Sequence, residues 1–187
     1  MRRSLVVLAC LVASGCAPTP ARVETPRIEA LDKSYAVELP TGWIRQYTAE
    51  KNLIASRDGF LLQTIALVRR PLKEAFPRTK KVATTGMLPS ELAELEIAEL
   101  KLRGELTAAL TVLENEPAAL SGKEGFRVKV AYNNARGLEF NEVVYGVADE
   151  SSMYRVTYRA PKLYYFDRYY PDFERAVQSF TLTKGKS

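Results

Sequence analysis

The sequence contains no histidine and only two cysteines, Cys10 and Cys16. Histidine is the most common general base and metal ligand in proteins, so its absence excludes imidazole-based catalytic triads and most familiar metal sites. Glycine-rich phosphate loops, paired metal-ligand motifs and a nucleophile elbow are also missing from the sequence. These absences favour a binding or accessory protein over an enzyme, and they indicate no cofactor.

Residues 1–15 have the pattern of an export signal. A cationic start is followed by a short apolar run and two small residues before a cysteine: Arg2, Arg3, residues 5–13, Ser14, Gly15 and Cys16. The apolar run is far shorter than the roughly 20 residues that a membrane-spanning helix needs. This pattern resembles the signal peptides of bacterial lipoproteins, which end in a lipobox and are cut before a cysteine. We therefore predict that residues 1–15 are removed and that Cys16 carries lipid, with a permanent signal anchor as the alternative.

Processing at Cys16 would change the composition of the mature chain. Cys10 leaves with the signal and Cys16 is bound to lipid, so neither a free thiol nor a disulfide remains. The formal charge falls from +5 to +3, because 25 basic residues remain against 22 acidic ones. So mild an excess does not indicate nucleic acid as a partner. Because Ala17 rather than aspartate follows Cys16, the resemblance to Gram-negative lipoproteins favours the outer membrane, facing the periplasm, over the inner membrane.

Three segments are expected after the signal. Residues 16–33 are polar, contain several prolines and lack hydrophobic periodicity, so they are predicted to be a flexible tether behind the lipidated cysteine. Residues 34–183 have the length and apolar content of a single domain with its own core. Residues 184–187 are a polar tail.

The domain is predicted to begin with strands. Alternating apolar residues indicate a strand at 35–39, followed by a turn and by Trp43 as a core residue. Asp58-Gly59 is typical of a two-residue hairpin turn and separates expected strands at 53–57 and 60–68.

A helix and four further strands are expected next. Ser90 is predicted to cap a helix that runs to about residue 103, with solvent-facing glutamates on much of its surface: Glu91, Glu94, Glu96 and Glu99. Period-two patterns then predict an antiparallel meander at 111–114, 125–132, 138–148 and 153–160. A last helix at 170–178 and a strand at 179–182 complete an α+β domain, an antiparallel sheet flanked by helices.

Both ends of this domain resemble a known family. Residues 35–43, Tyr-Ala-Val-Glu-Leu-Pro-Thr-Gly-Trp, resemble the opening strand and turn of the PsbP-like superfamily, and residues 170–182 resemble its last helix and strand. The resemblance implies an α/β/α sandwich. It also implies an accessory or docking role without a catalytic motif, since members of the group mostly act in that way.

Two segments are candidate binding surfaces. Residues 69–81 hold six basic residues and one acidic residue, and their prolines predict a loop: Arg69, Arg70, Lys73, Arg78, Lys80 and Lys81. Such a loop could dock on anionic lipid headgroups or an acidic partner, or it could be a solvated connector that protects a sheet edge. Residues 164–170 are rich in tyrosine, which suits either an interface or core packing with hydroxyls near water: Tyr164, Tyr165, Tyr169 and Tyr170.

These features predict a membrane-anchored envelope lipoprotein that acts as a non-catalytic binding or accessory module. Its expected partners are the membrane, through the N-terminal lipid, and an envelope protein or anionic surface. Two alternatives stay open. A helix and sheet could enclose a small apolar ligand in a carrier, or carboxylate pairs could serve an envelope hydrolase: Asp149 with Glu150, and Asp167 with Asp172.

Overall fold

The structure of the protein is a computed structural model, and it describes residues 19–104 and 109–183. The described chain forms strands β1 to β11 at Ala21–Arg22, Arg27–Glu29, Tyr35–Glu38, Ile44–Tyr47, Leu53–Ser56, Thr64–Pro71, Thr111–Leu120, Lys123–Asn133, Glu139–Ala148, Ser152–Pro161 and Thr181–Leu182. Its helices are α1 at Pro89–Lys101 and α2 at Asp167–Ser179, with a 3-10 turn η1 at Leu72–Glu74 and a π-type turn η2 at Lys162–Phe166. None of the helices in this part of the chain is long and apolar enough to cross a membrane.

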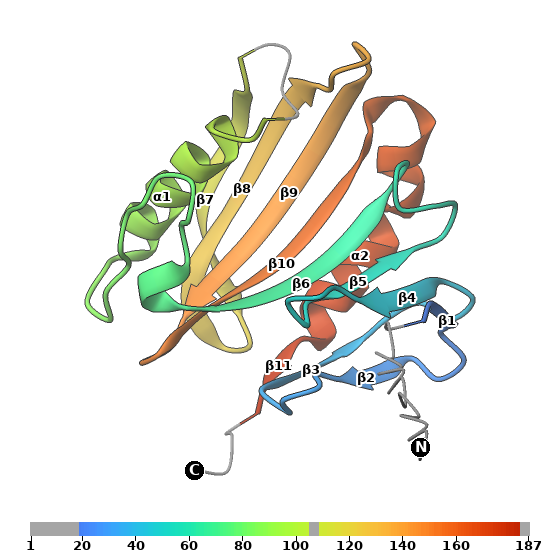
Figure 1. Cartoon of the computed structure of the whole chain (residues 1–187), viewed down its shortest axis with the longest axis horizontal. Coiled ribbons are helices and arrows are strands. Elements are labelled where there is room, and N and C mark those ends of the chain that lie inside the picture. Colours follow the sequence, from blue (N-terminus) through green and yellow to red (C-terminus); the bar gives the residue numbers. More distant parts are fainter. Residues whose placement is uncertain (1–18, 105–108, 184–187) are drawn as a thin grey trace, which may run out of the picture.

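The strands form one large and one small sheet (Figure 1). The large sheet has eight strands in the order β1-β4-β5-β6-β10-β9-β8-β7, and the small one has the order β11-β3-β2. Each strand pairing in the described part is antiparallel. An antiparallel sheet with two helices confirms the predicted α+β class.

The predicted meander is confirmed, because β7, β8, β9 and β10 pair in sequence order. Strand β6 then pairs with β10 over eight residues and joins the first half of the chain to the second. Successive side chains of a strand point to opposite faces of a sheet. In β10, Tyr154, Val156 and Tyr158 therefore lie on one face, whereas Met153 and Arg155 lie on the other.

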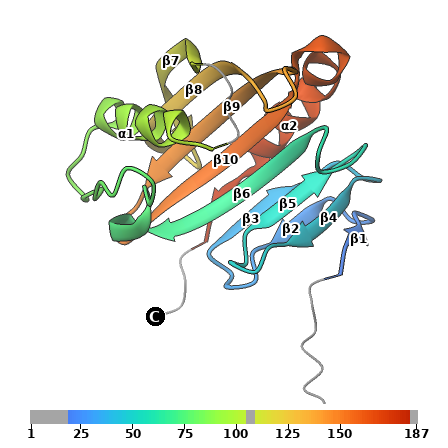
Figure 2. The ribbon, with the colours of Figure 1, turned by 45° about the horizontal axis from the view of Figure 1, so that its top comes forward.

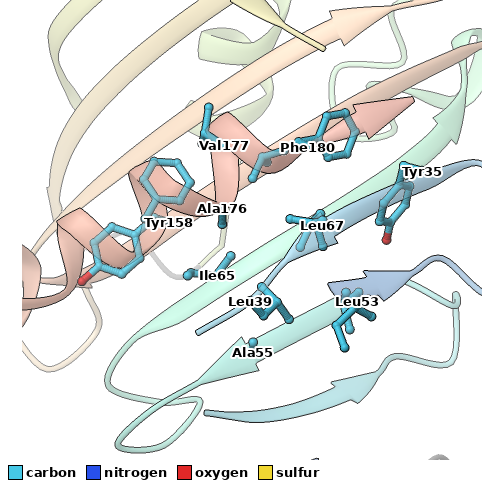
Figure 3. Close-up of a cluster of buried hydrophobic side chains, with 14 of the residues drawn as sticks. Tyr35, Leu39, Leu53, Ala55, Ile65, Leu67, Tyr158, Ala176, Val177 and Phe180 are labelled. Atoms are coloured by element: carbon cyan, nitrogen blue, oxygen red, sulfur yellow. The ribbon is translucent and has the colours of Figure 1, made fainter. Parts of the chain in front are cut away.

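Each face of the large sheet has its own packed cluster. On one face, α1 contacts β7, β8 and β9, where Leu92 and Leu100 pack with Phe126 and Val128. On the other face, α2 and the small sheet enclose a larger core that Figure 3 shows in part: Tyr35, Leu39, Leu53, Ile65, Leu67, Tyr158, Ala176, Val177 and Phe180. Trp43 belongs to this core with an exposed fraction of 1%, as predicted.

The domain begins earlier than predicted. Strands β1 and β2 lie within residues 16–33, the expected tether, and Val23 and Ile28 from this segment are buried in the core. Strand β1 pairs with β4 and β2 pairs with β3, so the prolines lie in the connections between short strands. The prediction failed here because these strands are only two and three residues long and their partners are distant in sequence. The expected signal peptide, Cys16 and tail 184–187 lie outside the described residues.

Several element boundaries also differ from the predictions. Strands β5 and β6 pair as expected, but residues 57–63 connect them in place of a two-residue turn, so β6 continues through Arg69 and Arg70. Strand β4 was not predicted. Helix α1 begins at Pro89 rather than after Ser90, and its first turn is closed when the Glu91 carboxylate accepts a hydrogen bond from the backbone N–H of Leu88.

Candidate functional site

A charged cavity lies on the α1 side of the large sheet. Helix α1 covers the β7–β9 part of this face and leaves β6 and β10 uncovered by a helix (Figure 2). The cavity over these two strands has a volume of about 240 Å³. We call it the arginine cavity, and its lining is Thr64, Ala66, Val68, Arg70, Ala75, Pro77, Arg78, Glu96, Glu99, Leu100, Arg103, Glu142, Arg155, Thr157 and Arg159. Its floor is hollow because two small residues, Ala66 and Thr157, stand opposite each other in the β6–β10 pairing.

A buried ion pair joins α1 to the floor of the arginine cavity. Arg155 of β10 donates from Nε to Oε2 of Glu96 at 2.5 Å, and the two side chains are only 8% and 6% exposed. Arg155 also donates from Nη2 to the carbonyl oxygen of Ala75 at 2.9 Å. Its guanidinium lies 4.8 Å from the ring centre of Phe76. These contacts fix the guanidinium in one position at the wall of the cavity.

A second buried ion pair lies where α1 ends. Arg103 donates from both Nη atoms to the Glu142 carboxylate, at 2.6 and 2.9 Å, and Tyr132 donates to the same carboxylate at 3.2 Å. Burial alone would raise the pKa of Glu142, but Arg103, with Arg159 and the Tyr132 hydroxyl, outweighs it and lowers that pKa. Burial, together with the negative charge of Glu142, raises the pKa of Tyr132. Glu142 is therefore an anion at neutral pH.

The third carboxylate of the cavity holds the segment before α1. Glu99 is 5% exposed and accepts the backbone N–H groups of Arg78 and Thr79, each at 2.9 Å, while the Arg78 side chain adds an ion pair at 3.2 Å. Arg70 pairs at 2.6 Å with Glu50, which lies outside the lining and whose side chain is 64% exposed.

The lining therefore carries five arginines against three glutamates, and each glutamate is already in an ion pair with arginine. Such a lining offers hydrogen-bond donors rather than acceptors, and guanidinium groups match carboxylates and phosphates in shape and charge. Among residues 19–104 and 109–183, no group of three His, Cys, Asp or Glu side chains is placed to hold a metal ion. The chemistry of the cavity suits the binding of an anion.

The basic residues predicted as one surface are divided by the structure. Arg70 and Arg78 line the arginine cavity. Arg69 points to the opposite face of the sheet, where it pairs with Asp32 at 2.6 Å and donates to the Ser152 hydroxyl at 3.1 Å. The other three residues are exposed on the connection between β6 and α1, and their amino groups form no ion pair within the described chain; we call Lys73, Lys80 and Lys81 the lysine cluster.

The predicted tyrosine surface is divided in the same way. Tyr169 is 9% exposed and packs edge-on against Trp43. Tyr170 stacks on Phe166 and accepts a hydrogen bond from Arg127, and burial raises its pKa to about 12. Tyr165 is partly buried against the same core, whereas Tyr164 is 58% exposed beside the exposed Leu163. Core packing therefore accounts for most of the segment.

The carboxylates considered for hydrolysis have local structural contacts. Asp149 accepts the backbone N–H groups of Ser151 and Ser152 and so shapes the β9–β10 turn. Burial tends to raise its pKa, but these hydrogen bonds lower it. Asp172 pairs with Arg175 one turn along α2.

Most of the arginine cavity was missed by the sequence predictions. Glu96 and Glu99 were expected to face solvent, but α1 turns them toward the sheet. A signal was present in the predicted strands, because Glu142 and Arg155 stand beside valine and aromatic residues in strands at the centre of a sheet. A charged residue in such a position usually has an opposite charge beside it.

No protein-family model matches the sequence, and no curated protein matches it in sequence.

Solved structures with a similar fold do exist. The cyanobacterial PsbP protein (CyanoP) of Synechocystis sp. PCC 6803 superposes with a TM-score of 0.59 at 11% identity, covering 94% of this chain and 99% of that one. LpqN of Mycobacterium tuberculosis, described as involved in cell envelope biogenesis, gives 0.57 at 12% identity and covers 90% and 91%. The Saccharomyces cerevisiae Ran-binding protein Mog1p gives 0.56 at 10% identity and covers 89% and 96%. The described chain is therefore similar in fold to PsbP-like proteins over nearly its whole length.

Proposed function

We propose that this protein is a membrane-anchored envelope lipoprotein whose domain is a non-catalytic binding module for a protein partner. The observation that carries the proposal is the likeness of fold, over about nine-tenths of the chain, to a Ran-binding protein and to a protein involved in cell envelope biogenesis. In this proposal α1 and α2 are the outer layers of a PsbP-like α/β/α sandwich.

The charges in the arginine cavity support binding rather than catalysis. An acid–base pair of carboxylates needs one group that keeps its proton at neutral pH. Each carboxylate of the cavity instead lies in an ion pair with arginine, and the pKa of Glu142 is lowered. The same charges argue against a carrier of an apolar ligand, because the space between α1 and the uncovered strands is lined by guanidinium and carboxylate groups.

Lipid on Cys16 would orient the domain on the membrane. Cys16 precedes the first residue of β1, Ala21, by five residues, and such a segment spans about 17 Å at most. Strand β1 is one edge of the eight-stranded sheet and β7 is the other, about 34 Å away at the usual spacing of strands. The β1 edge would therefore face the membrane, and α1 with β7 would face the periplasm. Ala17 favours the outer membrane.

The lysine cluster is the contact surface that we assign to the partner. Three exposed ammonium groups that have no carboxylate partner among residues 19–104 and 109–183 lie on one connection, next to arginines that are already paired. An acidic patch on a partner would complement them, and charge complementarity of this kind accelerates encounter and selects partners.

Cross-linking in intact envelopes tests this function. We expect the wild-type protein to capture one specific envelope protein, and the variant with Lys73, Lys80 and Lys81 replaced by glutamate to lose it. The matched control replaces three exposed lysines elsewhere with glutamate, Lys33, Lys51 and Lys123. Its charge changes equally, and it should capture the same protein. Loss in both variants, or in neither, would overturn the assigned surface. Failure of the wild-type protein to capture a specific protein would overturn the binding function.

The anchor has a separate test. Cys16→Ser removes the thiol that would carry the lipid, so we expect the protein to move from the membrane fraction to the soluble periplasmic fraction and to lose labelling by palmitate. A Cys16→Ser protein that still incorporates palmitate would contradict lipid anchorage at this residue. The control is Cys10→Ser, which should leave both fractionation and labelling unchanged.

A further inference from the structure

We infer that a second cavity, beside helix α2, is a binding site for a small organic monoanion that joins a carboxylate to a compact apolar body. This cavity has a volume of about 510 Å³ and lies between α2 and the turn that connects β3 to β4; we call it the α2 cavity. The site is independent of lipid anchorage, of the lysine cluster and of a protein partner. Three features point to such a ligand: an apolar wall, two arginines without an ion pair and a mild positive charge.

The apolar wall of the α2 cavity comes from two segments that are distant in sequence. The turn after β3 supplies Leu39, Pro40 and Trp43, and α2 supplies Tyr169. Trp43 packs edge-on against Tyr169 with ring centres 5.7 Å apart, and Leu39, Trp43 and Tyr169 are at most 9% exposed, so the wall is fixed by the core. The volume lies within the range of ligand-binding pockets, about 300–1,000 Å³. The cavity therefore has room and an apolar contact for the body of a small molecule.

Two arginines of the lining are held in place without a carboxylate partner. Arg57 and Arg168 form no ion pair and no side-chain hydrogen bond within residues 19–104 and 109–183. The guanidinium of Arg168 lies 5.4 Å from the ring centre of Tyr169 and 4.9 Å from that of Tyr164. Arg57 rests on the turn, where its Nη1 lies 2.6 Å from the place that a Cβ on Gly42 would take. These contacts restrict both guanidinium groups before a ligand arrives, which lowers the entropic cost of binding.

Both guanidinium groups lie at the same end of the α2 cavity. Burial raises the pKa of Tyr169 and the neighbouring Asp58 carboxylate raises it further, whereas the positive charges of Arg168 and Arg57 lower it. Exposed charges act only over short distances in water, so both arginines lie near the Tyr169 hydroxyl. Asp58 lies outside the lining and forms an ion pair with neither arginine. Guanidinium donors match a carboxylate in shape and charge, so we place the carboxylate of the ligand between Arg57 and Arg168.

The charges of the lining suit a monoanion. Three arginines, Arg57, Arg168 and Arg175, stand against two carboxylates, Glu38 and Asp172, which leaves a formal charge of +1. Arg175 is already paired with Asp172. A single carboxylate would balance the lining, and a cation would be repelled. Glu38 is exposed and would oppose an anion in the cavity, so its charge should weaken binding.

Binding of phenylpropionate to the full chain in detergent micelles tests the inference. Trp43 is the only tryptophan in the sequence and lies in the wall of the α2 cavity, so its fluorescence reports on the site directly. We expect a saturable change of this fluorescence at millimolar phenylpropionate. Phenylpropionamide lacks the charge and acetate lacks the apolar body, so each should bind about tenfold more weakly or less.

Four variants make the test specific. Arg57→Gln and Arg168→Gln should each weaken binding of phenylpropionate about tenfold, because each removes a charge-assisted hydrogen bond to the carboxylate. Both should fold, since both side chains are exposed. Glu38→Gln should strengthen binding about twofold, because it removes an exposed like charge. Arg136→Gln is the matched control: Arg136 is an exposed arginine on another connection, outside the lining, and its loss should leave binding unchanged.

Four outcomes would overturn the inference. The first is that phenylpropionate causes no saturable change at millimolar concentration. The second is that phenylpropionamide binds as tightly as phenylpropionate, which would make the α2 cavity an apolar crevice that does not recognise charge. The third is that acetate binds as tightly as phenylpropionate, which would leave the apolar wall without a role. The fourth is that Arg57→Gln and Arg168→Gln both bind as tightly as the wild type, which would place the carboxylate elsewhere.

Discussion

The two faces of the large sheet are built differently. On the face toward α2 and the small sheet, the buried core consists of aromatic and aliphatic residues such as Trp43, Tyr158 and Phe173, and the ion pair of Arg127 with Glu114 lies at its margin beside Tyr145 and Tyr170. On the face toward α1, apolar packing between α1 and the sheet is joined by two buried ion pairs, one at Glu142 of β9 and one at Arg155 of β10. One sheet thus carries an apolar face and a partly ionic face.

This difference separates the residues that stabilise the fold from those that shape a site. Burial of apolar surface contributes about 25 cal/mol per Å² to stability. A buried ion pair contributes little net stability, because desolvation of the two charges offsets their attraction. Apolar residues in the place of Glu96 and Arg155 would hold α1 on the sheet at least as well. Net stability alone therefore does not explain why these charges are buried.

The largest effect on stability is expected from a substitution on the apolar face. Phe173 is fully buried on α2 and packs against Tyr145, Tyr158 and Tyr170. Phe173→Ala should lower the free energy of unfolding by about 3–5 kcal/mol, because it removes a large apolar side chain and leaves a cavity. Urea denaturation followed by circular dichroism would measure it. Arg175→Ala, an exposed position on the same helix, is the control and should change stability by less than about 0.5 kcal/mol. If Phe173→Ala lowers the free energy of unfolding by less than about 1 kcal/mol, the face toward α2 is not the main source of stability.

The buried ion pair should show a different pattern. Arg155→Met leaves Glu96 buried without its partner and should cost about 3 kcal/mol. The double variant Arg155→Met/Glu96→Leu replaces both charges with apolar groups and should recover the stability of the wild type or exceed it. Urea denaturation of the two variants measures the difference. A double variant that is less stable than Arg155→Met would mean that the ion pair itself holds α1 on the sheet.

The apolar face was largely predictable from the sequence, whereas the ionic face was not. Period-two alternation in residues 125–160 indicates half-buried strands, so the meander followed directly. Trp43, directly after the predicted turn, was also predicted to be a core residue, and it is buried. The arginine cavity depends instead on the pairing of β6 with β10 and on the rotation of α1 over the sheet. Neither is encoded in local periodicity, and for this reason Glu96 and Glu99 were predicted to face solvent.

A second failure concerns the short strands at the start of the domain. Strands β1 and β2 contain few residues, and distant partners stabilise them: Trp43 accepts the backbone N–H of Val23, and the carbonyl of Pro26 accepts that of Leu39. A segment with prolines and isolated apolar residues is typical of a linker when it is considered alone. Only its pairing with strands that are distant in sequence distinguishes this segment from a linker.

The two faces should also differ in how their contributions to stability depend on pH. The pKa of Glu142 lies below its ordinary value of 4.5, since Arg103 and Arg159 outweigh the effect of burial. The ion pair therefore stabilises the fold fully above about pH 4.5, the pKa in the unfolded chain, and this contribution is lost as pH falls through the lower pKa of the folded state. Glu142→Gln should be less stable than wild type at pH 7, and the difference should shrink below pH 4.5 in urea titrations. The loss of stability caused by Phe173→Ala should not depend on pH. If the losses caused by Phe173→Ala and by Glu142→Gln shrink equally below pH 4.5, the pH dependence does not come from Glu142.

The smallest effect on stability is expected from loss of the exposed ion pairs of β6. Arg69 pairs with Asp32 on one face and Arg70 with Glu50 on the other, and all four side chains are at least 31% exposed. Exposed pairs of this kind contribute at most about 1 kcal/mol and are screened by salt, so Arg69→Gln and Arg70→Gln should lower stability slightly and by similar amounts. Thermal denaturation at low and high salt would measure both. Similar losses would show that neither face gains much stability from its surface pair, because the two variants change the same residue type in one strand and differ only in the face that they alter.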